Sequence, residues 1–390
     1  MPPNHVLILG GLARSLINFR GALIKELLRS GYKVTAVAND ADEKVAVTLA
    51  EWVASFVPLK LDRTGMNPLA DLGTIIRLVR LMKRRKPDIF IGYTLKPVTY
   101  GLISARIANV PLRYAMITGL GYAFTEGNEV KRKVARVLSS SAYGIALRFA
   151  DGVIFQNAED EREFHARKFL SSGQKVIQVN GSGVDLKSFS PRPMPGGPIT
   201  FLMIARLLKD KGVYDYIEAA QLVKQVIPDA RFLLVGPLDA NPTAISKAEV
   251  DKLVQDGIIE YLGELTDVRP AIENCHVYVL PSFREGMPRT VLEAMAMRRP
   301  IISTNVPGCR AAIAHGENGL LVPPRDAREL AKAMCVLAND ADLRERMASS
   351  GLLKATREYG DSQIAEQLVH ALQISSGGKG DGFSPPARSR

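Results

Sequence analysis

The feature that most constrains the fold is an alternation of short apolar runs with helical segments, which restarts once along the chain. In the first half, β-branched and aliphatic runs predict strands at residues 6–9, 33–38, 88–92, 113–117 and 152–156. Segments with helical periodicity lie between them, the first near residues 18–30. Strands that alternate with helices pair in parallel and are covered by helices on both faces. The first half is therefore predicted to be a doubly wound α/β domain.

A proline- and glycine-rich segment at residues 191–198 interrupts this alternation and is predicted to be a linker. The alternation then resumes, with strands predicted at residues 199–204, 231–235, 258–262, 277–280, 300–303 and 319–322. A chain of 390 residues is also too long for one ordinary hydrophobic core. We predict domains at residues 1–190 and 199–360, followed by a last helix. Residues 375–390 are rich in Gly, Ser and Pro and are predicted to be disordered.

Two carboxylates, Glu285 and Glu293, lie eight positions apart across a turn and a predicted helix start. This spacing places one acid on a loop and the other on the first turns of a helix, so that both can face one pocket. The helix N-terminus between them presents backbone N–H groups, which bind anions. Such a pocket suits a ligand that carries both hydroxyl groups and phosphate. A nucleotide sugar is a ligand of this kind.

Two cations, Arg206 and Lys211, follow the first predicted strand of the second half. They lie between the strand end at Ile204 and a predicted helix near Tyr214. Ligands of doubly wound sheets bind outside the carboxyl ends of the strands. The pair is therefore placed to clamp a diphosphate, the arginine through its fork of donors and the lysine as a point charge. A solvated basic loop is the alternative interpretation of this segment taken alone.

Gly10 and Gly11 also stand between a predicted strand and a predicted helix. They do not form the G-x-G-x-x-G fingerprint of dinucleotide-binding folds, because Leu12 and Ala13 follow directly. This counts against a simple nicotinamide-dependent dehydrogenase. A tight turn without a ligand is the alternative.

Together, these motifs resemble the donor site of glycosyltransferase family 4. The segments that carry the resemblance are Arg206…Lys211-Gly212, Phe283-Arg-Glu285-Gly286 with Glu293, and residues 180–185, 300–308 and 316–324. The resemblance covers roughly residues 4–375 and is stronger in the second half. It implies the GT-B architecture, an α/β fold in which two Rossmann-like doubly wound domains face each other across a cleft. It also implies that a C-terminal helix, residues 361–374, crosses back to the first domain.

The resemblance further implies a role for each matched residue. Arg206 and Lys211 would hold the diphosphate of a UDP-sugar, Glu293 the ribose hydroxyls, and Glu285 a hydroxyl of the transferred sugar. Arg206, Lys211 and Glu285 are thereby assigned as catalytic residues. Further donor contacts would come mainly from the backbone N–H groups of loops and helix starts. These donor-binding positions are Gly11, Gly286, Met287, Thr290 and Val291.

Enzymes of this family resemble one another in retaining the configuration of the anomeric carbon. The departing phosphate takes the acceptor proton on the same face, so no protein base is required. Many relatives carry a histidine in the first domain near the cleft, but the comparable stretch here, residues 118–125, has none. The residue nearest the anomeric carbon is therefore left unassigned. The five histidines and three cysteines show no metal-ligand spacing, and neither a metal nor a cofactor is expected.

Residues 15–20, 118–125 and 155–157 resemble a narrower group within the family. Its members build bacterial surface polysaccharides or lipid-linked oligosaccharides by adding sugars, often N-acetylhexosamines, to acceptors linked to undecaprenyl diphosphate. The acceptor-binding candidates are Asn18, Arg20, Lys96, Thr118 and Gly119.

The excess positive charge is confined to the first half of the chain. Residues 1–192 hold 28 Lys and Arg against 16 Asp and Glu, whereas residues 193–390 hold 23 against 24. Residues 72–86, and a second helix that begins at residues 131–136, combine apolar stripes with Lys and Arg. This is the composition of helices that lie on membranes, although core-facing helices with solvated charges have it too. We predict a cytoplasmic protein that binds the anionic inner face of the cell membrane peripherally, without a signal peptide or a spanning helix.

The sequence thus predicts a retaining, metal-independent glycosyltransferase that moves a hexose or N-acetylhexosamine from UDP to an undecaprenyl-diphosphate-linked glycan. Closure across the 191–198 linker would complete the site. A UDP-sugar epimerase on the same architecture is the first alternative, and it would need acid and base groups at the cleft. A basic nucleic-acid-binding protein is the second. Few basic motifs with interleaved aromatic residues are visible, so no nucleic acid partner is expected.

Overall fold

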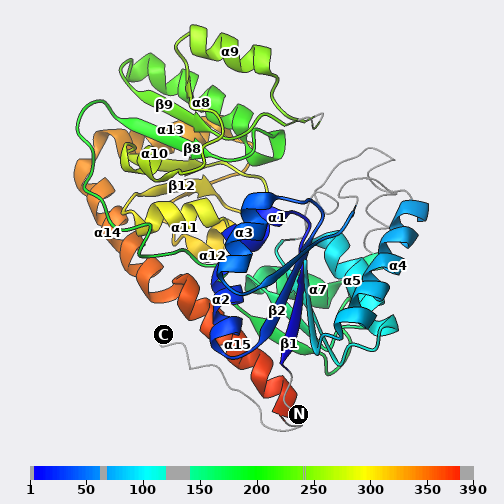
Figure 1. Ribbon diagram of the computed structural model, residues 1–390. Helices are drawn as coiled ribbons and strands as arrows, with labels where there is room; N and C mark the ends of the chain where they lie inside the picture. The colour runs from blue at the N-terminus through cyan, green and yellow to red at the C-terminus, as the bar shows by residue number, and fades with distance from the viewer. Residues whose placement is uncertain (1–3, 62–67, 120–140, 240, 242, 378–390) are drawn as a thin grey trace.

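The computed structural model describes residues 4–61, 68–119, 141–239, 241 and 243–377. The described residues form a seven-stranded and a six-stranded parallel sheet, each with helices on both faces (Figure 1). The predicted helix that begins at residues 131–136, most of the 118–125 loop and the chain from residue 378 lie outside the described residues.

The first sheet has the strand order β3-β2-β1-β4-β5-β6-β7. Its strands are β1 (His5–Leu9), β2 (Lys33–Ala38), β3 (Ser55–Pro58), β4 (Ile89–Tyr93), β5 (Leu112–Ile117), β6 (Gly152–Phe155) and β7 (Lys175–Gln178). The described helices around it are α1 (Ala13–Asn18), α2 (Gly21–Arg29), α3 (Glu43–Glu51), α4 (Pro68–Arg85), α5 (Leu95–Ile107) and α7 (Ala158–Ala166). β1 and β4 are nearly all buried and apolar, as strands covered on both faces must be.

The second sheet repeats this topology in the order β10-β9-β8-β11-β12-β13. Its strands are β8 (Thr200–Ile204), β9 (Arg231–Val235), β10 (Glu260–Tyr261), β11 (Val277–Leu280), β12 (Ile301–Thr304) and β13 (Gly319–Val322). The helical segments are η2 (Lys209–Lys211), α8 (Val213–Val226), α9 (Lys247–Gln255), α10 (Arg269–Glu273), α11 (Arg289–Ala296), α12 (Pro307–Ala312), α13 (Ala327–Asn339) and α14 (Ala341–Glu358). In both sheets the strand order reverses beside the first strand, where doubly wound folds bind ligands.

The last helix, α15 (Asp361–Gly377), returns to the first sheet and runs beside α2 (Figure 1). Ile364, Leu368 and Leu372 are buried there in the core of the first sheet. α15 continues to Gly377, three residues beyond the predicted end of the last helix at residue 374.

The chain crosses between the two sheets at two adjacent places. The Val184 N–H donates to Tyr359 O at 2.8 Å, and the Asp361 N–H donates to Val184 O at 3.1 Å. Val184 is fully buried in the core of the second sheet, whereas Val179 is buried in the core of the first. The second core thus begins before the predicted linker. We propose that the boundary between the two units lies within residues 180–183.

Every predicted strand overlaps an observed one, but two strands and the short helix α1 were missed. The helix predicted near residues 18–30 corresponds to α2 (Gly21–Arg29), and α1 (Ala13–Asn18) precedes it. β3 and β7 are edge strands with partly exposed residues, so they lack the continuous apolar run of the central strands. Among the described helices, none is long and apolar enough to cross a bilayer.

Candidate active site

A cavity of about 460 Å³ lies at the carboxyl ends of β8 and β11 and reaches Asn18 and Phe19 of the first unit. It therefore lies between the two sheets, at the reversal of strand order in the second. Seven of the predicted site residues line it. These are Asn18, Arg206, Lys211, Glu285, Met287, Thr290 and Glu293.

Lys211 reaches the cavity from the short η2 turn that follows β8. Its Nζ donates to Glu285 Oε1 at 2.5 Å, and its side chain is about one-quarter exposed, at 25%. The next residue, Gly212, has φ +76°, and a Cβ there would lie 2.0 Å from Pro281 O, so only glycine fits. The Phe283 N–H donates to Asp210 O at 2.9 Å. Lys211 and Glu285 are thus held together by the backbone as well as by their ion pair.

Arg206 is the more solvated cation of the site. Its side chain is 55% exposed, and Nη1 lies 3.7 Å from Asp239 Oδ2. An exposed ion pair at this distance contributes little to stability. The Arg206 guanidinium is therefore available to an anion in the cavity.

The loop that carries Glu285 is held from the first sheet as well as from the second. Asn157, at the end of β6, donates from Nδ2 to Gly286 O at 2.7 Å. Thr118 and Gly119, after β5, approach Gly286 so closely that a Cβ on Gly286 would lie 2.5 Å from Thr118 O. Two predicted acceptor residues therefore touch the loop that carries Glu285. Asn157 was not assigned a role from the sequence, since its partner is 129 positions away.

Glu293 lies in α11, and its carboxylate faces the same cavity as Glu285. It is 7% exposed, and its Oε1 accepts from Arg289 Nε at 2.9 Å. Burial raises the pKa of Glu293, and the Arg289 guanidinium opposes this effect. Arg289 also lies over the Phe19 ring of the first unit, 5.6 Å from its centroid. Each of the two carboxylates is thus paired with a cation at the cavity.

The start of α11 is held by a buried tyrosine. Tyr278 Oη donates to Thr290 Oγ1 at 2.6 Å. Pro288 precedes the helix and forms no side-chain cap. The first N–H groups of a helix have no acceptor within it, so those of Arg289 and Thr290 remain available for a ligand.

Seven predicted site residues do not line the cavity, namely Gly11, Arg20, Lys96, Thr118, Gly119, Gly286 and Val291. The Val291 side chain is fully buried in the core, and its N–H donates to Pro288 O at 3.1 Å. Lys96 Nζ pairs with Asp71 Oδ1 at 3.1 Å, and this pair ties α5 to α4.

Arg20 is buried in the turn between α1 and α2. Its guanidinium lies 4.7 Å from the centroid of the Tyr93 ring, and burial lowers its pKa to about 10. Its Nη1 donates to Phe19 O at 2.9 Å, while Nε has no hydrogen-bond partner within the described residues. Arg20 thus supports the turn that presents Asn18 and Phe19 to the cavity.

The burial of Glu293 predicts a dependence of stability on pH. The pKa of a glutamate in an unfolded chain is about 4.3. Because the folded pKa is raised, the wild type should lose stability as the pH rises from the unfolded to the folded pKa. Glu293→Gln removes this loss and keeps an acceptor for Arg289. Denaturant unfolding measures the effect. The free energy of unfolding of the variant minus that of the wild type should increase across this window and then level off.

Glu317→Gln is the matched control, because Glu317 is exposed. Its difference from the wild type should not change over the same pH window. If the difference in free energy of unfolding between Glu293→Gln and the wild type is also independent of pH, the raised pKa of Glu293 is contradicted.

Two family models match this chain. Residues 18–179 match the Glycosyl transferase 4-like domain, and residues 198–340 match Glycosyl transferases group 1. The chain belongs to the group 1 glycosyltransferases. The predicted family is thereby confirmed, and so is the class of reaction, glycosyl transfer.

This glycosyltransferase is similar to several bacterial enzymes over most of its length. It is 29% identical to the N,N'-diacetylbacillosaminyl-diphospho-undecaprenol alpha-1,3-N-acetylgalactosaminyltransferase of Campylobacter jejuni, covering 91% of this chain and 94% of the relative. It is 26% identical to the UDP-Gal:alpha-D-GlcNAc-diphosphoundecaprenol alpha-1,3-galactosyltransferase of Escherichia coli, covering 74% and 75%. It is 24% identical to the capsular polysaccharide biosynthesis glycosyltransferase CapM of Staphylococcus aureus, covering 92% and 93%.

Solved structures confirm the predicted GT-B fold. Sucrose-phosphate synthase of Thermosynechococcus elongatus has a TM-score of 0.78 at 18% identity, covering 95% of this chain and 99% of that one. The Anabaena protein HepE, solved in complex with UDP, has a TM-score of 0.75 at 18% identity, covering 95% and 100%. The glycosyltransferase therefore has the GT-B fold, built on its seven- and six-stranded sheets.

Proposed function

We propose that this glycosyltransferase moves a hexose or N-acetylhexosamine from UDP to a glycan carried on undecaprenyl diphosphate, with retention of anomeric configuration. The observation that carries the proposal is the cavity between the sheets. Arg206, Lys211, Glu285, Glu293 and the N-terminus of α11 face it together. Two similar proteins are named as transferases that act on diphospho-undecaprenol-linked sugars, and HepE was solved with UDP-glucose. These names support the substrate classes.

The donor fits the cavity by the chemistry of its parts. Arg206 and Lys211 hold the diphosphate, together with the Thr290 N–H at the start of α11. Glu293 accepts hydrogen bonds from the ribose hydroxyls. For this, the ribose must replace Arg289 as the partner of the Glu293 carboxylate. Glu285 accepts from a hydroxyl of the transferred sugar.

Further contacts come from the backbone and from the first unit. The N–H groups of Gly286 and Met287 face the sugar, and Gly11 borders the donor from the first sheet. The acceptor approaches from that side, past Asn18 and the backbone of Thr118 and Gly119. Arg20 and Lys96 lie behind this surface, so we propose that they act on the acceptor only through their neighbours.

The proton that the acceptor loses needs no acceptor beyond the two substrates. The bond between the anomeric carbon and the UDP oxygen breaks, and the acceptor oxygen bonds to that carbon on the same face. The acceptor hydroxyl proton passes to the departing phosphate oxygen. Arg206, Lys211 and the helix N–H groups offset the charge that develops on UDP. We therefore propose a reaction that is independent of metal ions.

The test is to incubate the purified protein with a panel of UDP-sugars, with and without an undecaprenyl-diphosphate-linked acceptor. Mass spectrometry identifies the products, and NMR gives their anomeric configuration. The proposal predicts an α-linked product from an α-linked donor, formed only with the acceptor present. A new UDP-sugar formed without acceptor would instead support the epimerase.

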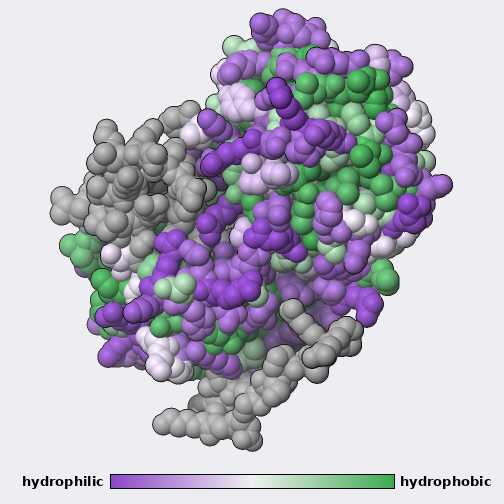
Figure 2. Space-filling view, turned by 180° about the vertical axis from the view of Figure 1, so that it is seen from behind, coloured by the Kyte–Doolittle hydropathy of each residue, from purple (hydrophilic) through white to green (hydrophobic). Residues whose placement is uncertain are grey.

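We also propose that α4 contacts the anionic inner leaflet of the cell membrane. Its inner face, at Leu78 and Met82, is buried in the core. On its outer face Leu72 and Ile76 are 53% and 42% exposed, and Lys and Arg follow toward the end of the helix. Seen from behind, the unit of the first sheet is mainly hydrophilic, with apolar groups scattered along its outer edge (Figure 2). Exposed apolar side chains beside cations are typical of interfacial helices.

Removing three of these cations should weaken the binding to vesicles. Each cation near an anionic surface contributes about 1 kcal/mol, so replacing Arg80, Lys83 and Arg84 by serine should cost about 3 kcal/mol. This corresponds to binding weakened about 100-fold. Sedimentation with vesicles that contain anionic lipid, at low and high salt, measures the effect.

The matched control replaces three exposed lysines of the second unit, Lys247, Lys252 and Lys332, by serine. It makes the same change in net charge far from α4, and binding should change little. Equal losses for the two triple variants would contradict a role for α4.

A further inference from the structure

Arg299 is a fully buried arginine between α11 and β12. Arginine is rarely buried completely, because its charge must be separated from water. Burial lowers the pKa of the Arg299 guanidinium. A side chain that is costly to bury needs a full set of hydrogen-bond partners, and Arg299 has such a set.

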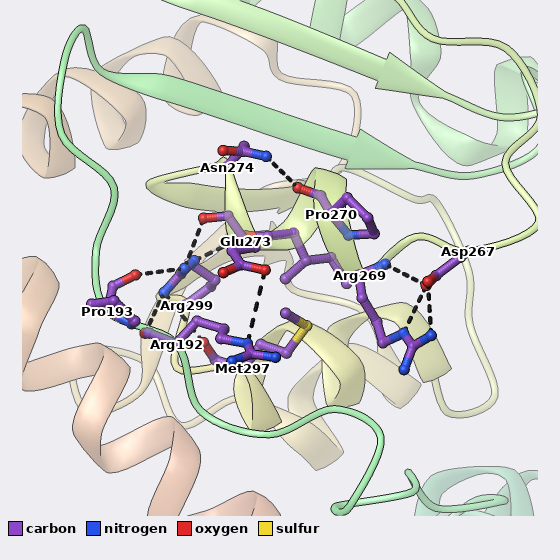
Figure 3. Close-up of polar contacts among 10 residues, drawn as sticks. Arg192, Pro193, Asp267, Arg269, Pro270, Glu273, Asn274, Met297 and Arg299 are labelled. Atoms are coloured by element: carbon purple, nitrogen blue, oxygen red, sulfur yellow. Dashed lines mark hydrogen bonds and ion pairs between the residues drawn. The ribbon is translucent and has the colours of Figure 1, made fainter.

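Six backbone carbonyl oxygens accept hydrogen bonds from Arg299 at 2.8–3.2 Å. Those of Pro193 and Glu273 can be followed in Figure 3. The six oxygens come in pairs from three segments. Ile272 and Glu273 end α10, Met297 and Arg298 follow α11, and Arg192 and Pro193 belong to the segment 191–198. All three nitrogens of the guanidinium take part, and its five N–H donors are used.

The two helices that end at Arg299 begin at the donor cavity. α10 follows Asp267 and Val268, and α11 follows Met287 and Pro288, all four of which line the cavity. α11 also carries Glu293. A helix is stiff along its axis, so the position of its end at Arg299 affects the position of its start.

The segment 191–198 is also tied at Arg299. The Arg192 N–H donates to Met297 O at 3.4 Å, and its guanidinium lies 3.8 Å from the carboxylate of Glu273. The chemistry of the three segments favours arginine. Carbonyl groups at helix ends carry partial negative charge, and a planar fork of five donors reaches several of them at once.

We propose that Arg299 is a positioning residue that holds α10, α11 and the segment 191–198 together as one body and so sets the shape of the donor cavity. The inference rests on the proposed role of this cavity in binding the UDP-sugar. Arg299 does not touch the donor. It acts through the helices whose opposite ends carry the cavity wall.

The test compares Arg299→Met, Arg299→Lys and the matched variant Arg298→Lys. Arg298 is the neighbouring arginine, and its side chain pairs with Glu345 and not with α10 or the linker. Lysine keeps the charge but has only three donors, so it cannot replace the six bonds. For Arg299→Lys we expect the KM for the UDP-sugar to rise about 10-fold, with kcat and the acceptor KM within about threefold of the wild type.

Hydrogen exchange gives a readout that does not depend on activity, and it also serves if Arg299→Met fails to fold. In Arg299→Lys, exchange should speed up in residues 191–198 and 269–273 and remain unchanged in β8 and β11. General acceleration with equal changes in both KM values would overturn the inference, since it would show a loss of stability alone. Wild-type exchange and donor KM in Arg299→Lys would also overturn it. If the wild type fails to bind UDP, the proposed function fails. The exchange result still tests whether Arg299 holds α10, α11 and the segment 191–198 together.

Discussion

Replacing Lys211 by alanine is expected to lower kcat about 100- to 1,000-fold, as for the loss of one preorganised charge that stabilises a departing group. Lys211 lines the cavity, and its Nζ is held 2.5 Å from Glu285 Oε1. It is thus placed to offset charge on the departing diphosphate without first being reoriented. Steady-state transfer rates, measured at saturating donor and acceptor, give the change in kcat.

Lys209→Ala is the matched control for this variant. Lys209 lies in the same η2 turn, is exposed and does not line the cavity. Both variants remove one positive charge, so any effect of net charge is the same in both. Equal losses in the two variants, or nearly wild-type kcat in Lys211→Ala, would contradict the proposed role of Lys211.

Gly286→Ala is expected to abolish most transfer by separating the loop that carries Glu285 from the first sheet. A Cβ at this position would lie 2.5 Å from Thr118 O and 2.9 Å from Gly119 N, and both are backbone atoms that cannot rotate away. The shift would also weaken the hydrogen bond from Asn157 to Gly286 O. A displacement of about 1 Å at a reacting centre costs on the order of 100-fold in rate.

Gly196→Ala is the control, since a Cβ there would meet nothing within 4 Å and φ is not positive. It should have wild-type activity. Thermal unfolding of both variants separates a change in fold from a change in the site. A Gly286→Ala enzyme as active as Gly196→Ala would show that transfer does not need contact between this loop and the first sheet.

The strands could be predicted because parallel strands buried on both faces read as continuous apolar runs. Residues 33–38, 231–235, 277–280 and 319–322 were predicted as strands with the bounds that the structure shows. β3 and β7 lie at the edges of their sheet, where partial exposure removes this signal.

The short helix α1 and the turn after it could not be predicted from local sequence. In this turn Arg20 lies against Tyr93 of β4, and Phe19 lies against Arg289 of the second unit. Both contacts join segments that are distant in sequence. Such tertiary contacts override local periodicity.

The candidate site was predictable where a residue follows a strand end. Arg206 and Lys211 follow β8 and Glu285 follows β11, and all three line the cavity; Glu293 lines it from α11. The contact of Asn157 with Gly286 depends on how the two sheets approach each other, which no local pattern encodes.

Lys96, predicted to bind the acceptor, has a partner that could not be predicted. Its ammonium group donates to Asp71, 25 residues earlier. The sequence gives no spacing that would reveal such a pair.

Glu285→Ala is the most direct test of the proposed donor site. Transfer and UDP binding are measured on the same preparation, the first by product formation and the second by calorimetry. We predict that transfer falls at least about 100-fold while the Kd for UDP stays within about threefold, because the proposed partner of Glu285 is the sugar and not the nucleotide. Transfer at the wild-type rate in Glu285→Ala would contradict this assignment.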